Sequence, residues 1–139
     1  VSGLFIEGFS SKTTYGGKEK INTIYTFEVD NIKVLYLGAL GETDLSNKAK
    51  EEIGDIDVLF VPIGGDGVLD PQEAYKVAVK REPKIIIPIH FGQVGEKDSL
   101  KKFLKEAGAE DVKTVDKLTL KSKDLVGRQG DVVPIKPTS

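Results

Sequence analysis

The chain has 139 residues, 39% of them hydrophobic and 30% charged, which is typical of one globular domain with its own core. Its formal net charge of −2 and the lack of a long apolar run favour neither nucleic acid nor a membrane as partner, so we expect a cytoplasmic location. The absence of cysteine excludes disulfides and thiolate zinc sites, and there is a single histidine, His90. Methionine is absent even at position 1, so we expect either a chain that starts after a removed segment or a piece of a longer polypeptide, and we favour a piece, with residues 1–139 as a single domain or part of one.

The first part of the sequence predicts antiparallel strands. Residues 4–9 form an apolar run that suits a short strand, and the polar stretch from Ser10 to Lys20 is typical of a loop. Residues 22–29 and 33–37 are rich in β-branched and aromatic side chains, and Asp30–Asn31 between them is a tight-turn signal. Together these segments predict a β-hairpin.

The middle of the sequence alternates helices with apolar strands. We expect a helix at about 46–53, after a glycine-bearing loop. The nearly continuous apolar run 56–63 then predicts a strand that is buried on both faces. It is followed by the glycine-rich segment 64–67.

The clearest helix start in the sequence comes next. Asp70 suits the N-cap, Pro71 suits the first helical position, and Glu73 stands where a capping box needs an acid. The apolar stripe that follows predicts a helix ending near Arg81, because Pro83 prevents its continuation.

The last part of the sequence predicts further alternation. Residues 85–89 suit a buried strand, and a helix is expected from Ser99 to a stop at Gly108. Three short strands are expected in the tail, at 112–115, 117–120 and 131–135. The resulting order, β-β-β-α-β-α-β-α-β, predicts an α/β fold with a mixed β-sheet and helices packed on it.

Four motifs, in this order and spacing, resemble the metallo-β-lactamase superfamily. They are Gly38–Gly41 (GALG), Ile56–Gly65 (IDVLFVPIGG), Asp70–Ala74 (DPQEA) and Pro83–Gly92 (PKIIIPIHFG). More narrowly, the set resembles the branch of zinc-dependent hydrolases related to ascorbate-6-phosphate lactonase. The resemblance covers nearly the whole chain and implies the C-terminal half of an αββα sandwich, in which two mixed sheets pack face to face between helices.

The resemblance also implies where metal ligands would lie. The family's His-x-His-x-Asp-His loop belongs to its first half and has no counterpart in this chain. The aspartate of the second half is replaced by Ala39, so His90 alone matches a family ligand, as a vestigial metal site. The resemblance therefore implies zinc in an intact relative, and we expect none for this chain alone.

Each candidate side chain also has a structural interpretation. His90 can be a ligand or a histidine hydrogen-bonded at the sheet edge, and the structural role is favoured. The segment Gly64-Gly65-Asp66 can line a cleft or simply form a tight turn, and the turn is favoured. Glu42 and Asp44 can substitute for the missing aspartate as metal ligands, but capping of the following helix by Asp44 or Ser46 is favoured. Nucleophilic hydroxyls are a further hypothesis, for Ser10, Ser11, Thr13 and Thr14, and a polar loop explains these residues better.

The resemblance makes a metal-dependent hydrolase-like protein the main functional hypothesis. We expect the isolated chain to be inactive, because most of the family's metal ligands are absent from it. The alternative is a non-catalytic interaction or scaffold module. Half of a sandwich would expose an apolar sheet face, so it would pair with a missing N-terminal half or with a second copy of the chain. A third hypothesis is a closed α/β layer with helices on both faces of the sheet.

Overall fold

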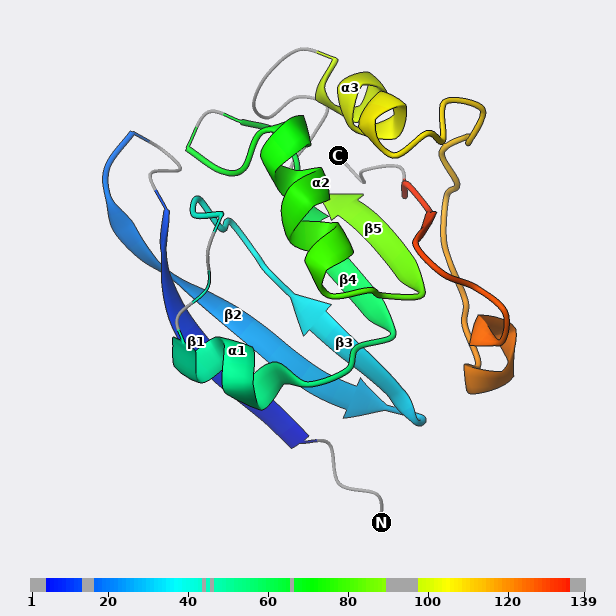
Figure 1. Cartoon of the computed structure of the whole chain (residues 1–139), viewed down its shortest axis with the longest axis horizontal. Helices are drawn as coiled ribbons and strands as arrows, with labels where there is room; N and C mark the ends of the chain where they lie inside the picture. Colours follow the sequence, from blue (N-terminus) through cyan, green and yellow to red (C-terminus); the bar gives the residue numbers. More distant parts are fainter. Residues whose placement is uncertain are drawn as a thin grey trace.

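The computed structural model describes residues 5–13, 17–43, 45, 47–65, 67–89 and 98–135. Its strands form one mixed sheet in the order β1-β2-β3-β4-β5-β6 (Figure 1). The strands are β1 (Phe5–Thr13), β2 (Lys20–Val29), β3 (Ile32–Tyr36), β4 (Val58–Pro62), β5 (Ile85–Ile89) and β6 (Asp131–Val132). The helices are α1 (Asn47–Ile53), α2 (Pro71–Lys80), α3 (Ser99–Glu106) and the short 3₁₀ helix η1 (Ser122–Leu125). The predicted α/β class, element order and mixed sheet are confirmed.

The sheet changes from antiparallel to parallel at β3. Strands β1, β2 and β3 pair antiparallel, and β3 to β6 pair parallel. Asp30 and Asn31 form the turn between β2 and β3 with φ of 51° and 65°. Left-handed backbone at both positions matches the right-handed twist of a hairpin, and Asp and Asn tolerate it better than most residues. The predicted hairpin is therefore confirmed.

One predicted boundary and two predicted strands are wrong. The expected loop from Ser10 begins only after Thr13, because β1 continues in register as far as the pair Thr13–Lys20. Polar side chains are compatible with a strand there because β1 is an edge strand with a solvated side. In the tail, 117–120 is not a strand and 112–115 contributes only an isolated bridge between Val115 and Ile135. The tail instead packs against the cluster of Ile32, Val34 and Val58 through Leu118 and Leu120, and it forms η1, which the sequence did not predict.

Helix α2 starts as the sequence predicts. The Asp70 carboxylate accepts a 2.8 Å hydrogen bond from Glu73 N, and the Glu73 carboxylate accepts one of 3.2 Å from Asp70 N. The helix ends with Arg81 as its C-cap, two residues before Pro83. Ala74, with its neighbours on the same stripe, is buried against the sheet.

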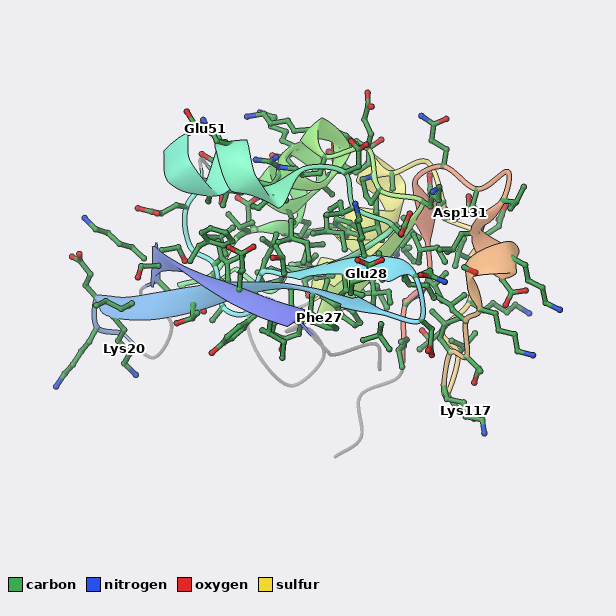
Figure 2. All side chains as sticks on the ribbon, turned by 90° about the horizontal axis from the view of Figure 1, so that it is seen from below. Lys20, Phe27, Glu28, Glu51, Lys117 and Asp131 are labelled. Carbon is green, nitrogen blue, oxygen red and sulfur yellow. The ribbon has the colours of Figure 1, made fainter. Side chains whose placement is uncertain are left out.

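The three α-helices that the structure describes all lie on one side of the sheet (Figure 2). Their core contains Leu35, Leu59 and Phe103, each with no exposed surface. Phe27 and Glu28 leave β2 on opposite sides, with Phe27 on the side away from the helices (Figure 2). The hypothesis of helices on both faces is therefore wrong for the described residues.

We call the side of β1–β5 away from the helices the open face. Its strand positions follow from the pairing register and the alternation of side chains along each strand. They are Ile6, Gly8, Ser10, Lys12, Ile21, Thr23, Tyr25, Phe27, Val29, Ile32, Val34, Tyr36, Val58, Phe60, Pro62, Ile85, Ile87 and Ile89. The tail covers part of this face through Leu118, Leu120 and the buried Leu125, whereas the open-face side chains that stay exposed are Ile6, Ile21, Tyr25, Val29 and Tyr36.

Candidate functional site

The parallel strands β3, β4 and β5 end at one edge of the sheet, which we call the carboxyl edge. Ligand sites of α/β sheets gather at such edges, on the loops that follow the strands. The loop after β3 contains Ala39, and the loop after β4 contains Gly64 and Gly65. The sequence candidates Thr14, Asp44, Asp66 and His90 lie outside the described residues.

Asn22 of β2 holds the loop after β3 in place. Its Oδ1 accepts a 3.0 Å hydrogen bond from Ala39 N, and its Nδ2 donates to Leu37 O at 2.9 Å and to Ser11 Oγ at 3.0 Å. Both protons and the oxygen of the Asn22 side-chain amide thus form hydrogen bonds. Gly38, with φ of 62°, passes so close that a Cβ there would be 2.9 Å from Asn22 Oδ1. The conformation at Ala39 therefore depends on a side chain from a neighbouring strand.

The loop after β4 is a closed turn. Gly65 N donates to Leu69 O at 3.0 Å, and Val68 N donates to Gly65 O at 3.4 Å. Gly64 and Gly65 are both buried, and Gly65 has a φ of 70°, which favours glycine. These contacts agree with the tight-turn interpretation of the two glycines.

The two loops and the end of β1 pack together around Gly41. Gly41 N donates to Lys12 O at 3.0 Å, Leu69 N donates to Leu40 O at 3.0 Å, and Thr13 Oγ1 donates to Gly67 O at 3.0 Å. A Cβ on Gly41 would lie 2.8 Å from Gly67 O and 3.1 Å from Thr13 Cα. Only glycine fits this junction without moving backbone.

The described polar side chains at the carboxyl edge are engaged with backbone. The hydroxyl of Ser11 donates to Asn22 O at 3.3 Å, and that of Thr13 donates to Gly67 O. The Glu42 carboxylate accepts from Lys12 N at 3.4 Å. Ser10 is exposed on β1. Within the described part of the chain, no three His, Asp or Glu side chains come together as a metal site would need.

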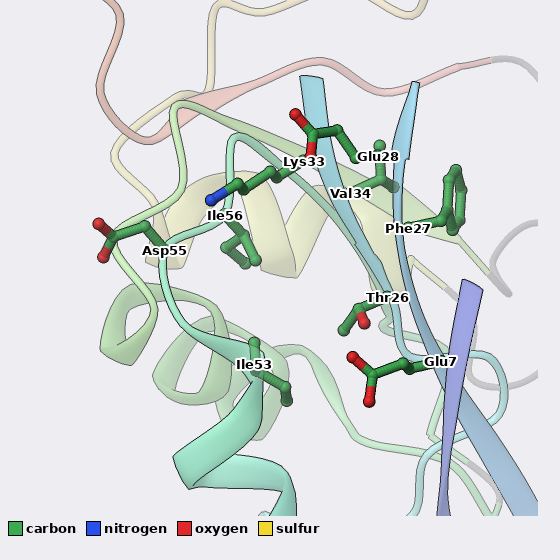
Figure 3. A pocket seen from close by; sticks show the side chains of 9 residues that line it. All are labelled: Glu7, Thr26, Phe27, Glu28, Lys33, Val34, Ile53, Asp55 and Ile56. Carbon is green, nitrogen blue, oxygen red and sulfur yellow. The ribbon is translucent and has the colours of Figure 1, made fainter. Parts of the chain in front are cut away.

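A second hollow, of about 150 Å³, lies on the helix side at the other end of β3 (Figure 3). Glu7 of β1, Glu28 of β2 and Asp55 after α1 line it together with Lys33 of β3. Figure 3 shows the Lys33 ammonium on the same side of the hollow as Asp55, and Glu7 beside Thr26. These carboxylates do not form a metal-binding group, and the hollow is far along the strand from Ala39.

Asp57 is the one described acid whose pKa is clearly shifted. Burial raises the pKa of its carboxyl, but hydrogen bonds from Lys33 N at 2.9 Å and from Lys84 Nζ at 2.8 Å outweigh burial and hold the pKa below its ordinary value. Asp57 precedes β4, at the amino edge of the parallel strands. Its ion pair with Lys84 and its hydrogen bond from Lys33 N therefore join the amino ends of β3, β4 and β5, remote from the candidate site.

Sequence reasoning did not identify Asn22 as a residue of this site. A polar amide within the β-rich run 22–29 was the only available signal, and its partners on the loop after β3 are 15 to 17 residues away in the sequence. Such a contact becomes visible only when the pairing of β2 with β3 is known.

Residues 1–90 match the family model of the β-lactamase superfamily domain. A UPF0173 protein of Pyrococcus furiosus is 39% identical over 59 residues, 42% of this chain and 28% of that protein. A UPF0173 metal-dependent hydrolase of Thermococcus onnurineus is 31% identical over 70 residues, 48% of this chain and 30% of that protein. These matches thus span less than a third of the relatives' length.

A solved structure from Thermotoga maritima is similar over nearly the whole chain. It is described as a candidate zinc-dependent hydrolase of the metallo-β-lactamase superfamily, with a TM-score of 0.72 and 32% identity. The similarity covers 98% of this chain and 68% of that one. None of the helices described in the present structure has the length and apolar character needed to cross a bilayer.

Proposed function

Because the chain belongs to the metallo-β-lactamase superfamily, we propose that it is a metal-dependent hydrolase-like module that does not hydrolyse substrate by itself. The family relation favours esters or lactones as the substrate class of an intact, active relative, and zinc as its metal. For residues 1–139 we propose weak zinc binding and no hydrolysis, because a complete metal site needs donors that this part of the sequence does not supply.

The observation that carries the proposal is Ala39. It stands on the loop after β3, where the family motif has an aspartate, and its methyl group offers no donor atom. Its backbone N–H donates a hydrogen bond to Asn22 Oδ1 at 3.0 Å. Nearby, the carboxylate of Glu42 is turned toward Lys12 N. The described residues at this edge therefore do not fit a metal site of three protein ligands.

Zinc titration of the chain, followed by calorimetry, tests this proposal. We expect binding no tighter than about 100 µM, or about −5.5 kcal/mol, as for a site with one or two weak donors. His90→Ala should then change the affinity by less than about threefold. Tight, stoichiometric zinc that His90→Ala abolishes would contradict the proposal, and hydrolysis of ester or lactone substrates by the zinc-loaded chain would contradict it as well.

A second candidate function is a non-catalytic interaction module. The exposed apolar part of the open face favours it, because a surface of this kind is normally covered by a partner. One third of the Thermotoga maritima chain has no counterpart in this alignment, which supports a further segment of polypeptide as one such partner. Oligomeric state and partner binding, rather than hydrolysis, would distinguish this function from the first.

A further inference from the structure

We propose that the helix side of the sheet carries a binding site for a small phosphate monoester, in a hollow between α1 and α2. The hollow has a volume of about 300 Å³, at the lower end of the range for small-molecule sites. Ala39 and the glycines of the carboxyl edge do not line it, so the proposal goes beyond the proposed function and does not depend on it. The lining residues are Thr43, Leu45, Lys50, Val77, Lys80 and Arg81.

Three cationic side chains from two helices meet at this hollow. Lys80 is the last residue of α2 and Arg81 is its C-cap. Because they follow Val77 by three and four residues, all three share one face of the helix. Lys50 comes from the last turn of α1, which lies on the same side of the sheet as α2 (Figure 2). The packing of the two helices on the sheet therefore brings together cations that are some distance apart in the sequence.

The positive charge of this hollow exceeds what a helix end requires. A helix C-terminus carries roughly half a negative unit charge, which a single nearby cation balances. Three cations line this hollow, and none of its described lining residues is acidic. Two other polar hollows of the described chain have mixed charge instead. Their charged lining residues are Lys33, Glu7, Glu28 and Asp55 in one, and Lys102, Lys105, Asp70 and Glu106 in the other.

The Arg81 guanidinium has donors to offer an anion. Its backbone is fixed at the end of α2, where Arg81 N donates to Ala78 O at 3.2 Å. The side chain is partly buried, and no acid of the described residues forms an ion pair with it. The other arginine, Arg128, has its Nε 3.9 Å from the carboxylate of Asp131. Since a guanidinium presents two parallel donors that match two phosphate oxygens, a phosphate would supply the acceptors that Arg81 lacks.

The rest of the lining favours a phosphate monoester over a free anion. A phosphate monoester carries a charge of about −1.5 to −2 at pH 7 and three acceptor oxygens, enough to contact one guanidinium and two ammonium groups. The hydroxyl of Thr43, an exposed residue at this hollow, is a further donor. The apolar lining residues are Leu45 and Val77, only 8% and 5% exposed. They offer contact to the carbon part of a monoester, which inorganic phosphate does not have.

Calorimetric titration of the chain with phenyl phosphate and with inorganic phosphate, both with a metal chelator present, tests the proposal. We expect phenyl phosphate to bind with a Kd of about 1 mM or below, and inorganic phosphate to bind at least about threefold more weakly. Arg81→Ala should weaken the binding of phenyl phosphate by about tenfold or more. Arg81→Lys should restore part of that loss, because it keeps the charge without the two parallel donors.

Arg128→Ala is the matched control. It removes the same kind of side chain, but Arg128 does not line the hollow and is beside Asp131. The affinity of this variant for phenyl phosphate should equal that of the wild type. Because all three variants change surface or partly buried side chains, circular dichroism should show the wild-type fold in each.

Three outcomes would overturn the proposal. One is no binding of either probe up to about 10 mM. Another is equal weakening by Arg81→Ala and Arg128→Ala with folding intact, which would mean that only general positive charge attracts the probe. The third is equal affinity for the two probes, which would mean that Leu45 and Val77 do not contact the ligand. The chelator keeps zinc out of these titrations, so failure of this site and failure of the proposed function are distinguishable.

Discussion

The backbone N–H of Ala39 donates a 3.0 Å hydrogen bond to the side-chain Oδ1 of Asn22, which links the loop after β3 to the neighbouring strand. The same amide group donates to Leu37 O, so it bridges two backbone positions on the loop and replaces the pairing that a longer β3 would provide. The backbone at Ala39 is therefore held by a hydrogen bond within the protein.

Asn22→Ala should lower the free energy of unfolding by about 2 kcal/mol, because it removes three hydrogen bonds and leaves Ala39 N and Leu37 O without this partner. Urea unfolding measures the change. Ser10→Ala, at an exposed position of β1, is the control and should cost less than about 0.5 kcal/mol. Equal stability of Asn22→Ala and the wild type would show that the amide does not hold the loop.

Ala39→Asp should strengthen zinc binding at least tenfold, about 1.4 kcal/mol, because it places a carboxylate where the family resemblance implies an aspartate, on a loop that is already held. Calorimetric titration with zinc measures the effect. Ala39→Asn introduces a side chain of nearly the same shape as aspartate but without its charge, so its zinc affinity should increase much less. If the two variants bind zinc equally, the position does not face a metal site.

Gly41→Ala should destabilise the fold by about 2 kcal/mol or more, because its Cβ would lie 2.8 Å from Gly67 O and 3.1 Å from Thr13 Cα, both backbone atoms. Thermal unfolding measures the loss. Gly8→Ala is the matched control, since its Cβ would meet the side-chain methyl of Thr23 at 3.1 Å, and that methyl can move. A larger loss for Gly8→Ala would contradict the packing described at Gly41.

Asp57→Asn should remove a pH-dependent part of the stability. The folded-state pKa of Asp57 is below its ordinary value of 3.8, so its contribution is present above that value and is lost as the pH falls through the folded-state pKa. At pH 7 the free energy of unfolding of the variant should be lower than that of the wild type by about 1–2 kcal/mol. The loss is small because Lys84 is 45% exposed and water screens its charge.

The difference between Asp57→Asn and the wild type should shrink below pH 3.8, where the native carboxyl also becomes protonated. Urea unfolding at several pH values measures this. The exposed Asp55→Asn is the control. A difference that stays constant from pH 7 to below 3.8 would mean that the Asp57 charge is not what stabilises the native state.

Leu125→Ala should lower the free energy of unfolding by about 2–4 kcal/mol, because Leu125 is 3% exposed and attaches the tail to the open face. Val126→Ala, at a neighbouring residue that is 82% exposed, is the control and should cost less than about 0.5 kcal/mol. Chemical unfolding measures both. Similar effects of the two variants would contradict the docking of η1 on the sheet.

Local signals in the sequence determined most of the secondary structure. The Asp70–Glu73 capping box, the Asp30–Asn31 turn and the apolar run 85–89 each act over a few residues, and all three have the predicted structure. The tail was predicted less well, because the weakly apolar segment 117–120 forms no strand and instead packs Leu118 and Leu120 against the open face.

The sequence by itself determined the superfamily and the mixed α/β order, since these depend on motifs and on residue identity, and it predicted the loss of a metal donor at Ala39. Only the tertiary structure decided that Asn22 holds the Ala39 loop and that Gly41 is enclosed by backbone. It also decided that all described α-helices lie on one side of the sheet, which leaves Tyr25 and Tyr36 exposed on the other. These relationships join residues far apart in the chain, and strand pairing, which local sequence does not encode, brings them together.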